Sequence, residues 1–136
     1  MHEWALAEGV IATALEAGEK EGLTTIRKIS ITIGQLQNIK KEVFESALAA
    51  VMPASEPRLA GTEISLEIEP VRFRCRPCGN EFSLGDVRGP LDGDQLESIH
   101  LIPELAHAFM SCPHCDSPDF EVIRGRGVWI ESLEGE

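Results

Sequence analysis

The chain has 136 residues, which allows one or two small domains. Its 23 acidic and 12 basic residues give a formal net charge of −11, and it contains no tyrosine. Because binding to phosphates needs a basic face and single strands are held by aromatic stacking, this composition argues against nucleic acid as a partner.

The N-terminus does not read as a signal peptide. It lacks a basic start, and Glu3, Glu8 and Glu16 interrupt its apolar residues. The apolar stretches, such as 47–52, are far too short to span a bilayer. We therefore expect a cytoplasmic protein that does not associate with membranes, and whose thiols are reduced unless they bind a metal.

Two helices are predicted in the first half of the chain. Apolar residues recur at helical spacing over 4–21 and again over 38–52. Gly22 is the expected C-terminal stop of the first helix, and Asn38 is the expected N-cap of the second.

Two strands alternate with these helices, over 25–33 and 62–69, because apolar and polar residues alternate in both segments. The side chains expected to face a core are Ile29, Ile31 and Ile33 in the first strand, and Ile64, Leu66 and Ile68 in the second. Each strand should therefore have one buried and one exposed face.

The second half of the chain is less regular. Residues 71–83 are predicted to form a short hairpin, and the Gly- and Asp-rich segment 85–98 is predicted to be a loop. The apolar segment 99–111 follows, and then a return strand at 120–123 and a last strand over 128–133. Between these strands, two glycines flank Arg126 and indicate a crossing point.

Four cysteines stand in two pairs, Cys75 with Cys78 and Cys112 with Cys115. The spacing of each pair lets two thiolates of one tight turn face the same ion, and two such turns supply the four ligands of a closed tetrahedral zinc site. Gly79 follows the first pair, where a residue with positive φ is often needed. Disulfides are the weaker reading because nothing marks the chain as secreted, and four thiolates at this spacing also hold iron.

The order of elements predicts an α+β fold. Two helices cover a small three-stranded sheet, and a four-cysteine zinc ribbon is inserted between its second and third strands. The domain boundaries expected from this layout are 1–70 plus 126–136 for the α+β domain and 71–125 for the inserted zinc domain.

The four histidines differ in their sequence context. His114 lies inside the second cysteine pair and is predicted to be an exposed turn residue, or else a substitute zinc ligand when a thiolate is lost. His100 and His107 lie in apolar stretches, where a partly buried, hydrogen-bonded histidine is the expected reading. His2 places an imidazole and an amide beside the amine of the first residue, which is a ready metal chelate.

Several segments together resemble the HypA/HybF family of hydrogenase maturation nickel chaperones. They are the start MHEWALAEGV, the strand end ITIGQLQ, the two CxxC pairs, the segment SIHLIPELAHAF, and FEVIRGRGVWI near the end. The long spacing between the pairs and the HxIPE segment resemble the archaeal form. The combination is more specific than any of its parts, and the resemblance covers essentially the whole chain.

The resemblance implies a nickel-binding N-terminal domain with an inserted zinc domain, and a non-catalytic function. That function is delivery of Ni(II) to the large subunit of a [NiFe]-hydrogenase, with a HypB-type maturation GTPase as partner. His2 and Glu3 carry over as nickel-site residues, the four cysteines as ligands of a structural Zn(II), and His100 as the family's HxIPE histidine. The resemblance does not decide between a monomer and a homodimer, or whether the protein also supplies nickel to urease.

The chemistry of the first three residues gives this nickel site a concrete form. Ni(II) favours square-planar nitrogen ligation. We expect His2 to bind through its imidazole and amide, with either the Met1 amine or the Glu3 amide as the third nitrogen and His100 as the fourth. The main alternative function is a rubredoxin-like redox carrier with iron in the four-cysteine site.

Overall fold

The computed structural model describes residues 2–52, 56–87 and 91–136. They form two compact units. Unit 1 comprises Met1–Ile33, Ile39–Glu67 and Val128–Glu136, and unit 2 comprises Gly34–Asn38 and Ile68–Gly127. Residues 71–125, the expected inserted domain, fall within unit 2.

Both predicted helices are present in unit 1, as α1 (His2–Lys20) and α2 (Lys41–Val51). At the end of α1, Gly22 adopts a φ of 71°, and its amide and that of Leu23 donate to the carbonyls of Glu19 and Gly18. This is the hydrogen-bond pattern of a glycine-terminated helix, so the predicted stop is confirmed.

The prediction for Asn38 is wrong. The N-cap position of α2 is Lys40, and Asn38 instead ends a short 3-10 helix, η1 (Gln35–Gln37), with a left-handed φ of 51°. Asparagine tolerates this conformation better than most residues. Its side-chain amide donates to Glu97 Oε2 at 2.9 Å, so the polar group meets a partner within unit 2 and is not available as a helix cap.

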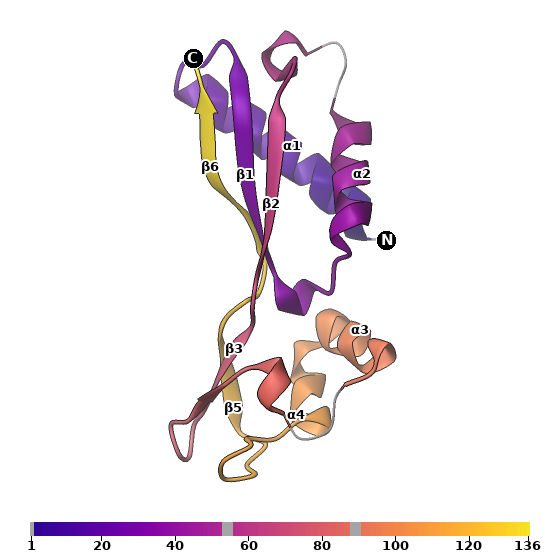
Figure 1. Cartoon of the computed structure of the whole chain (residues 1–136), viewed down its shortest axis with the longest axis vertical. Coiled ribbons are helices and arrows are strands. Elements are labelled where there is room, and N and C mark those ends of the chain that lie inside the picture. Colours follow the sequence, from indigo (N-terminus) through magenta and orange to yellow (C-terminus); the bar gives the residue numbers. More distant parts are fainter. Residues whose placement is uncertain (1, 53–55, 88–90) are drawn as a thin grey trace. The chain divides into compact units, whose positions relative to one another are not determined.

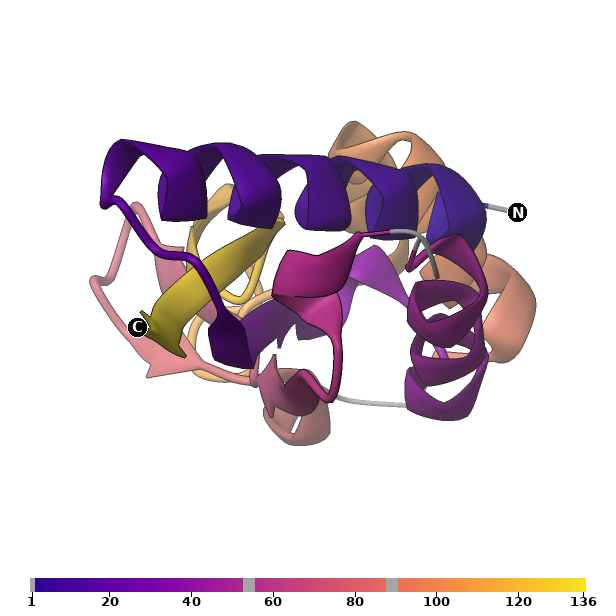
Figure 2. The ribbon, with the colours of Figure 1, turned by 90° about the horizontal axis from the view of Figure 1, so that it is seen from above.

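A three-stranded sheet lies under these helices, in the order β2 (Glu63–Glu69), β1 (Ile26–Gly34), β6 (Val128–Gly135). Strands β1 and β6 are antiparallel, and an extra residue in β6 shifts the register between the Ser30–Ser132 and Ile31–Ile130 pairs. Figure 1 shows both helices on one face of the sheet, and Figure 2 shows α1 lying across the strands.

The core of unit 1 contains the apolar faces that the sequence pattern predicts. Its buried side chains are Ala7, Val10, Ile11, Ala14, Ile26, Ile29, Ile31, Ile33, Phe44, Ala47, Leu48, Leu59 and Leu66. Ile68 is the exception, because its side chain is 39% exposed. It lies near the end of β2, an edge strand, and belongs by its contacts to unit 2.

Unit 2 has its own small sheet, in the order β4 (Glu81–Phe82), β3 (Arg72–Cys75), β5 (Phe120–Arg124), with both pairings antiparallel. Each strand contributes one phenylalanine to a common cluster. The ring centroid of Phe73 lies 5.2 Å from that of Phe82 and 5.3 Å from that of Phe120. The predicted hairpin and return strand are therefore confirmed.

The predicted loop over 85–98 is only partly correct, because a helix, α3 (Gly93–Leu101), begins within it. The Gln95 amide donates to Asp92 Oδ1 at 2.7 Å, and the Asp92 amide donates to Gln95 Oε1 at 3.0 Å. This reciprocal cap satisfies two amides at the helix start. A 3-10 turn, Pro103–Leu105, and the one-turn helix α4 (Ala106–Phe109) follow.

Two glycines allow a close approach of backbone segments in unit 2. A Cβ atom on Gly34 would lie 2.3 Å from the carbonyl oxygen of Gly125, and one on Gly125 would lie 2.3 Å from Cα of Val71. Gly125 also has a φ of 89°. Three backbone segments thus approach one another more closely than any side chain allows.

The fold is therefore α+β, as predicted, with small sheets and a cluster of four cysteines. None of the helices in the described ranges combines the length and apolar character needed to cross a membrane.

Candidate metal centre

The four cysteines converge at one end of unit 2. Their sulfur atoms all lie within 4.8 Å of one another. Cys75 Sγ lies 3.4 Å from Cys115 Sγ, and Cys78 Sγ lies 3.7 Å from Cys112 Sγ. A tetrahedral zinc site with Zn–S bonds of about 2.3 Å places its sulfurs about 3.8 Å apart, so the four sulfurs lie near enough to one another to share one such ion.

Two turns with the same backbone pattern hold these sulfurs. In the first, the Gly79 amide donates to the Cys75 carbonyl and the Cys75 amide donates to the Asn80 carbonyl. In the second, the Asp116 amide donates to the Cys112 carbonyl, and the Cys112 amide to that of Ser117.

The residue after each pair adopts a left-handed conformation, with a φ of 74° at Gly79 and 64° at Asp116. Ser111 Oγ donates to Asp116 Oδ1 at 2.8 Å, which fixes the side chain of the second turn. Sequence reasoning anticipated the role of Gly79 but not that of Asp116. Aspartate tolerates this conformation, and that tolerance was the available signal.

Polar groups near one of the sulfurs, Cys112 Sγ, favour its thiolate form. The His114 amide lies 3.4 Å from Cys112 Sγ, and Asn80 Nδ2 lies 3.9 Å from the same atom. Burial raises the pKa of Cys75 to about 12. Burial acts in the same direction on Cys112, but hydrogen bonds from the Cys115 and His114 amides outweigh it and lower its pKa to about 6.

These values describe a cluster that cannot ionise fully by itself. A bound dication supplies the positive charge that lets all four thiols lose their protons. Cys75 and Cys112 are buried, whereas Cys78 and Cys115 are exposed, so an ion has access from one side. Four soft thiolates in a tetrahedron suit zinc and also iron, and the cluster leaves no position for a further protein ligand.

The predicted nickel residues belong to different parts of the chain. Met1 lies outside the described residues, and His2 and Glu3 begin α1 in unit 1. His100 lies in the last turn of α3, in unit 2, where its side chain is half-buried.

The other two histidines lie near the cysteine cluster. His114 is exposed, as predicted for a turn residue. His107 is also exposed, so the prediction of partial burial is wrong. Its Nδ1 lies 2.7 Å from the Pro118 carbonyl oxygen, and its ring centroid lies 4.6 Å from that of Phe120, with the two rings tilted by 41°. It is hydrogen-bonded, as expected, but at the surface.

Comparisons with known proteins bear on the function of this fold. The model of the HypA family, described as a hydrogenase/urease nickel incorporation metallochaperone, matches residues 1–135. A hydrogenase maturation factor HypA from Pyrococcus abyssi is 45% identical over 136 residues, covering 100% of this chain and 96% of its own. One from Thermococcus onnurineus is 42% identical with the same coverage.

A solved structure supports the fold independently. The solution structure of the Ni metallochaperone HypA from Helicobacter pylori superimposes with a TM-score of 0.62 at 21% identity, covering 99% of this chain and 97% of that one. None of these matches supports the rubredoxin-like iron carrier. The chain therefore belongs to the HypA family of nickel metallochaperones, which act in hydrogenase maturation and are not enzymes.

Proposed function

We propose that this chain binds Ni(II) at its N-terminus through His2 and delivers it to the large subunit of a [NiFe]-hydrogenase, while a structural Zn(II) occupies the four-cysteine cluster. The observation that carries the proposal is the convergence of four cysteine sulfurs in a chain whose family incorporates nickel. A closed tetrathiolate site has no free position through which to pass on an ion. The cargo therefore needs a second site.

The start of α1 supports that second site. The first amides of a helix have no acceptor within the helix, so the His2 amide can lose its proton and bind a metal without breaking a helical hydrogen bond. Together with the imidazole it forms a chelate ring. Either the Met1 amine or the Glu3 amide supplies a third nitrogen, and His100 is the proposed fourth donor.

Such a site is suited to release as well as binding. Square-planar nickel is held by deprotonated nitrogens, so nickel affinity should fall as the pH falls. The proposed partners are the hydrogenase large subunit and a HypB-type GTPase that docks on unit 1. A chain in which a short flexible linker replaces residues 71–125 should still bind that GTPase, because unit 1 has its own core. Loss of binding by this folded chain would place the interface in the deleted segment.

Isothermal titration with Ni(II) tests the nickel site. His2→Ala should abolish high-affinity binding and leave the zinc content unchanged, and His100→Ala should weaken binding and change the nickel d–d absorption. His107→Ala is the matched control, because this exposed histidine lies in the same unit as His100 and should have no effect. Unchanged affinity in His2→Ala would refute the proposal.

Two added residues before Met1 distinguish the two chelates. The extension should strongly weaken Ni(II) binding if the Met1 amine is a ligand. It should leave the Ni(II) affinity unchanged if the Glu3 amide is the ligand. The zinc content should be the same in both cases.

A further inference from the structure

The two cysteine turns share a backbone pattern but differ in the side chain at one equivalent position. Asn80 in the first turn and Ser117 in the second each stand two residues after the second cysteine of their pair. The main-chain carbonyl of each accepts the amide of the first cysteine of its pair, at 2.8 Å in both turns. Both residues are half-buried. Their side chains nevertheless have different partners, so the cluster is not symmetric.

The Asn80 side chain reaches from its own turn to the other one. Its Nδ2 group donates to Cys112 Sγ, at an N–S distance of 3.9 Å. The Ser117 hydroxyl instead accepts the Asp119 amide at 3.1 Å, so this side chain is engaged with the following residues of its own segment. The first turn therefore supplies a side-chain donor to a sulfur of the second turn, and the equivalent residue of the second turn supplies none in return.

The main chain of Asn80 contacts both cysteines of its own turn. Its N–H group donates to the Cys78 sulfur, and its carbonyl accepts the Cys75 amide. One residue thus contacts three of the four cysteines, and it reaches Cys112 through its side chain. Because an alanine at this position keeps both main-chain groups, the side-chain contact can be removed by itself.

The charge of a four-thiolate site explains what this contact does. Four thiolates around a dication leave an excess of negative charge, which hydrogen-bond donors to the sulfurs offset. Hydrogen-bond partners of metal ligands also fix the orientation of those ligands. Cys112 has one donor from its own turn, the His114 amide at 3.4 Å, and Asn80 adds one from the opposite turn. Because Cys112 is fully buried, solvent does not supply such a donor in the intact chain.

We propose that Asn80 is a positioning residue of the metal centre. Its side-chain amide holds Cys112 in place from the opposite turn and draws negative charge from that thiolate, so that zinc is retained at the cysteines. This inference rests on the proposed occupation of the cysteine cluster by Zn(II).

The first test measures the zinc affinity of the full chain by competition with a chromophoric chelator. Asn80→Ala should lower the affinity by about 10-fold to 100-fold, as is typical when a hydrogen-bond partner of a metal ligand is lost. Asn80→Asp keeps the shape of the side chain but turns a carboxylate toward the thiolate, so it should lower the affinity further. Ser117→Ala is the matched control and should leave the affinity unchanged, because only the main chain of Ser117 supports the turn.

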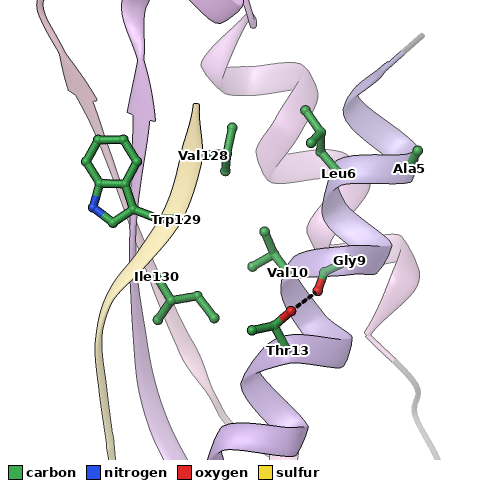
Figure 3. A pocket seen from close by; sticks show the side chains of 8 residues that line it. All are labelled: Ala5, Leu6, Gly9, Val10, Thr13, Val128, Trp129 and Ile130. Atoms are coloured by element: carbon green, nitrogen blue, oxygen red, sulfur yellow. Dashed lines mark hydrogen bonds between the residues drawn. The ribbon is translucent and has the colours of Figure 1, made fainter. Parts of the chain in front are cut away.

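Replacement of zinc by Co(II) separates this role from a purely structural one. A hydrogen bond lowers the energy of the sulfur lone pairs, so its loss in Asn80→Ala should move the thiolate-to-cobalt charge-transfer band to longer wavelength. Thr13→Val is the control for a general loss of stability. In unit 1, Thr13 Oγ donates to the Gly9 carbonyl at 2.7 Å in the wall of a hollow between α1 and β6 (Figure 3). Removal of that hydrogen bond should change neither the zinc affinity nor the cobalt band.

The proposal is overturned if Asn80→Ala binds zinc as tightly as Ser117→Ala, if its cobalt band stays at the wild-type wavelength, or if Asn80→Asp binds zinc as tightly as the wild type. These results, in a wild type that binds one zinc, would refute the role of Asn80 alone. A wild type that binds neither zinc nor cobalt at the cysteines would refute the structural zinc site as well.

Discussion

Unit 1 and unit 2 are similar in the number of strands but differ in what fills their cores. In unit 1, two amphipathic helices cover a sheet whose central strand is buried along most of its length. In unit 2, the strands are short, and the buried core contains three phenylalanines, the inner cysteines Cys75 and Cys112, and five other apolar residues. The first core is built from apolar side chains alone, whereas the second contains two of the proposed metal ligands.

This difference decides which unit can bind a metal that is later released. A small unit with short strands rarely folds on apolar burial alone and commonly needs a metal or disulfide staple. A metal held by the cysteines of unit 2 would thus be tied to folding, and an ion tied to folding cannot be released without unfolding. A releasable ion is better placed on unit 1, whose fold does not depend on it.

The largest expected effect follows from removing a proposed zinc ligand. Cys112→Ala should unfold unit 2, because binding of a structural zinc contributes on the order of 10–16 kcal/mol of apparent folding free energy. Amide exchange should show loss of protection over 71–84 and 117–124, with α1 and β1 still protected. His114→Ala, within the same turn, should change neither zinc content nor exchange. Retained protection in a zinc-free Cys112→Ala chain would show that a bound metal is not needed for unit 2 to fold.

The reciprocal change is Phe44→Ala in α2, which should destabilise unit 1 and spare unit 2. Phe44 is fully buried, and truncation of a buried phenylalanine costs about 3–5 kcal/mol. Urea unfolding followed by the fluorescence of Trp4 and Trp129 should report this loss, while zinc content stays at one per chain. Release of zinc in parallel with unit 1 unfolding would mean that the two units do not fold separately.

A smaller effect is expected at Gly125, where backbone segments of unit 2 approach closely. Gly125→Ala combines a positive φ with a clash against Val71, so it should cost on the order of 3 kcal/mol in unit 2. Gly9→Ala in α1 is the control, because the added methyl group has open space and should stabilise unit 1 by about 0.5–1 kcal/mol. Thermal melting of the two variants should therefore shift in opposite directions.

The smallest effect is expected at the cap of α3. Asp92→Ala removes the acceptor for the Gln95 amide and should cost about 1 kcal/mol locally. Faster amide exchange confined to 93–101 would report it, and Asp92→Asn should restore most of the protection. Loss of zinc from the Asp92→Ala chain would instead show that the cysteine site depends on an intact α3.

The same contrast explains which parts of the structure the sequence could predict. The helices and strands of unit 1 have strong periodicity, and the CxxC spacing predicts the four cysteines that converge in unit 2. The secondary structure of unit 2 is harder to predict from the sequence because its helices and strands are short. Helix α3 has little apolar periodicity, and its signal was the Asp92–Gln95 capping pair inside a loop-like composition. Asn38 was misassigned because its partner, Glu97, is distant in sequence.

The most direct test of two metals on two units is native mass spectrometry of the purified chain before and after addition of Ni(II), for the wild type and for His2→Ala. We predict one zinc per chain in both proteins before addition, and uptake of one nickel with zinc retained in the wild type alone. Nickel that displaces zinc from the cysteines, or that binds equally to His2→Ala, would contradict the assignment of cargo and structural metal to separate sites.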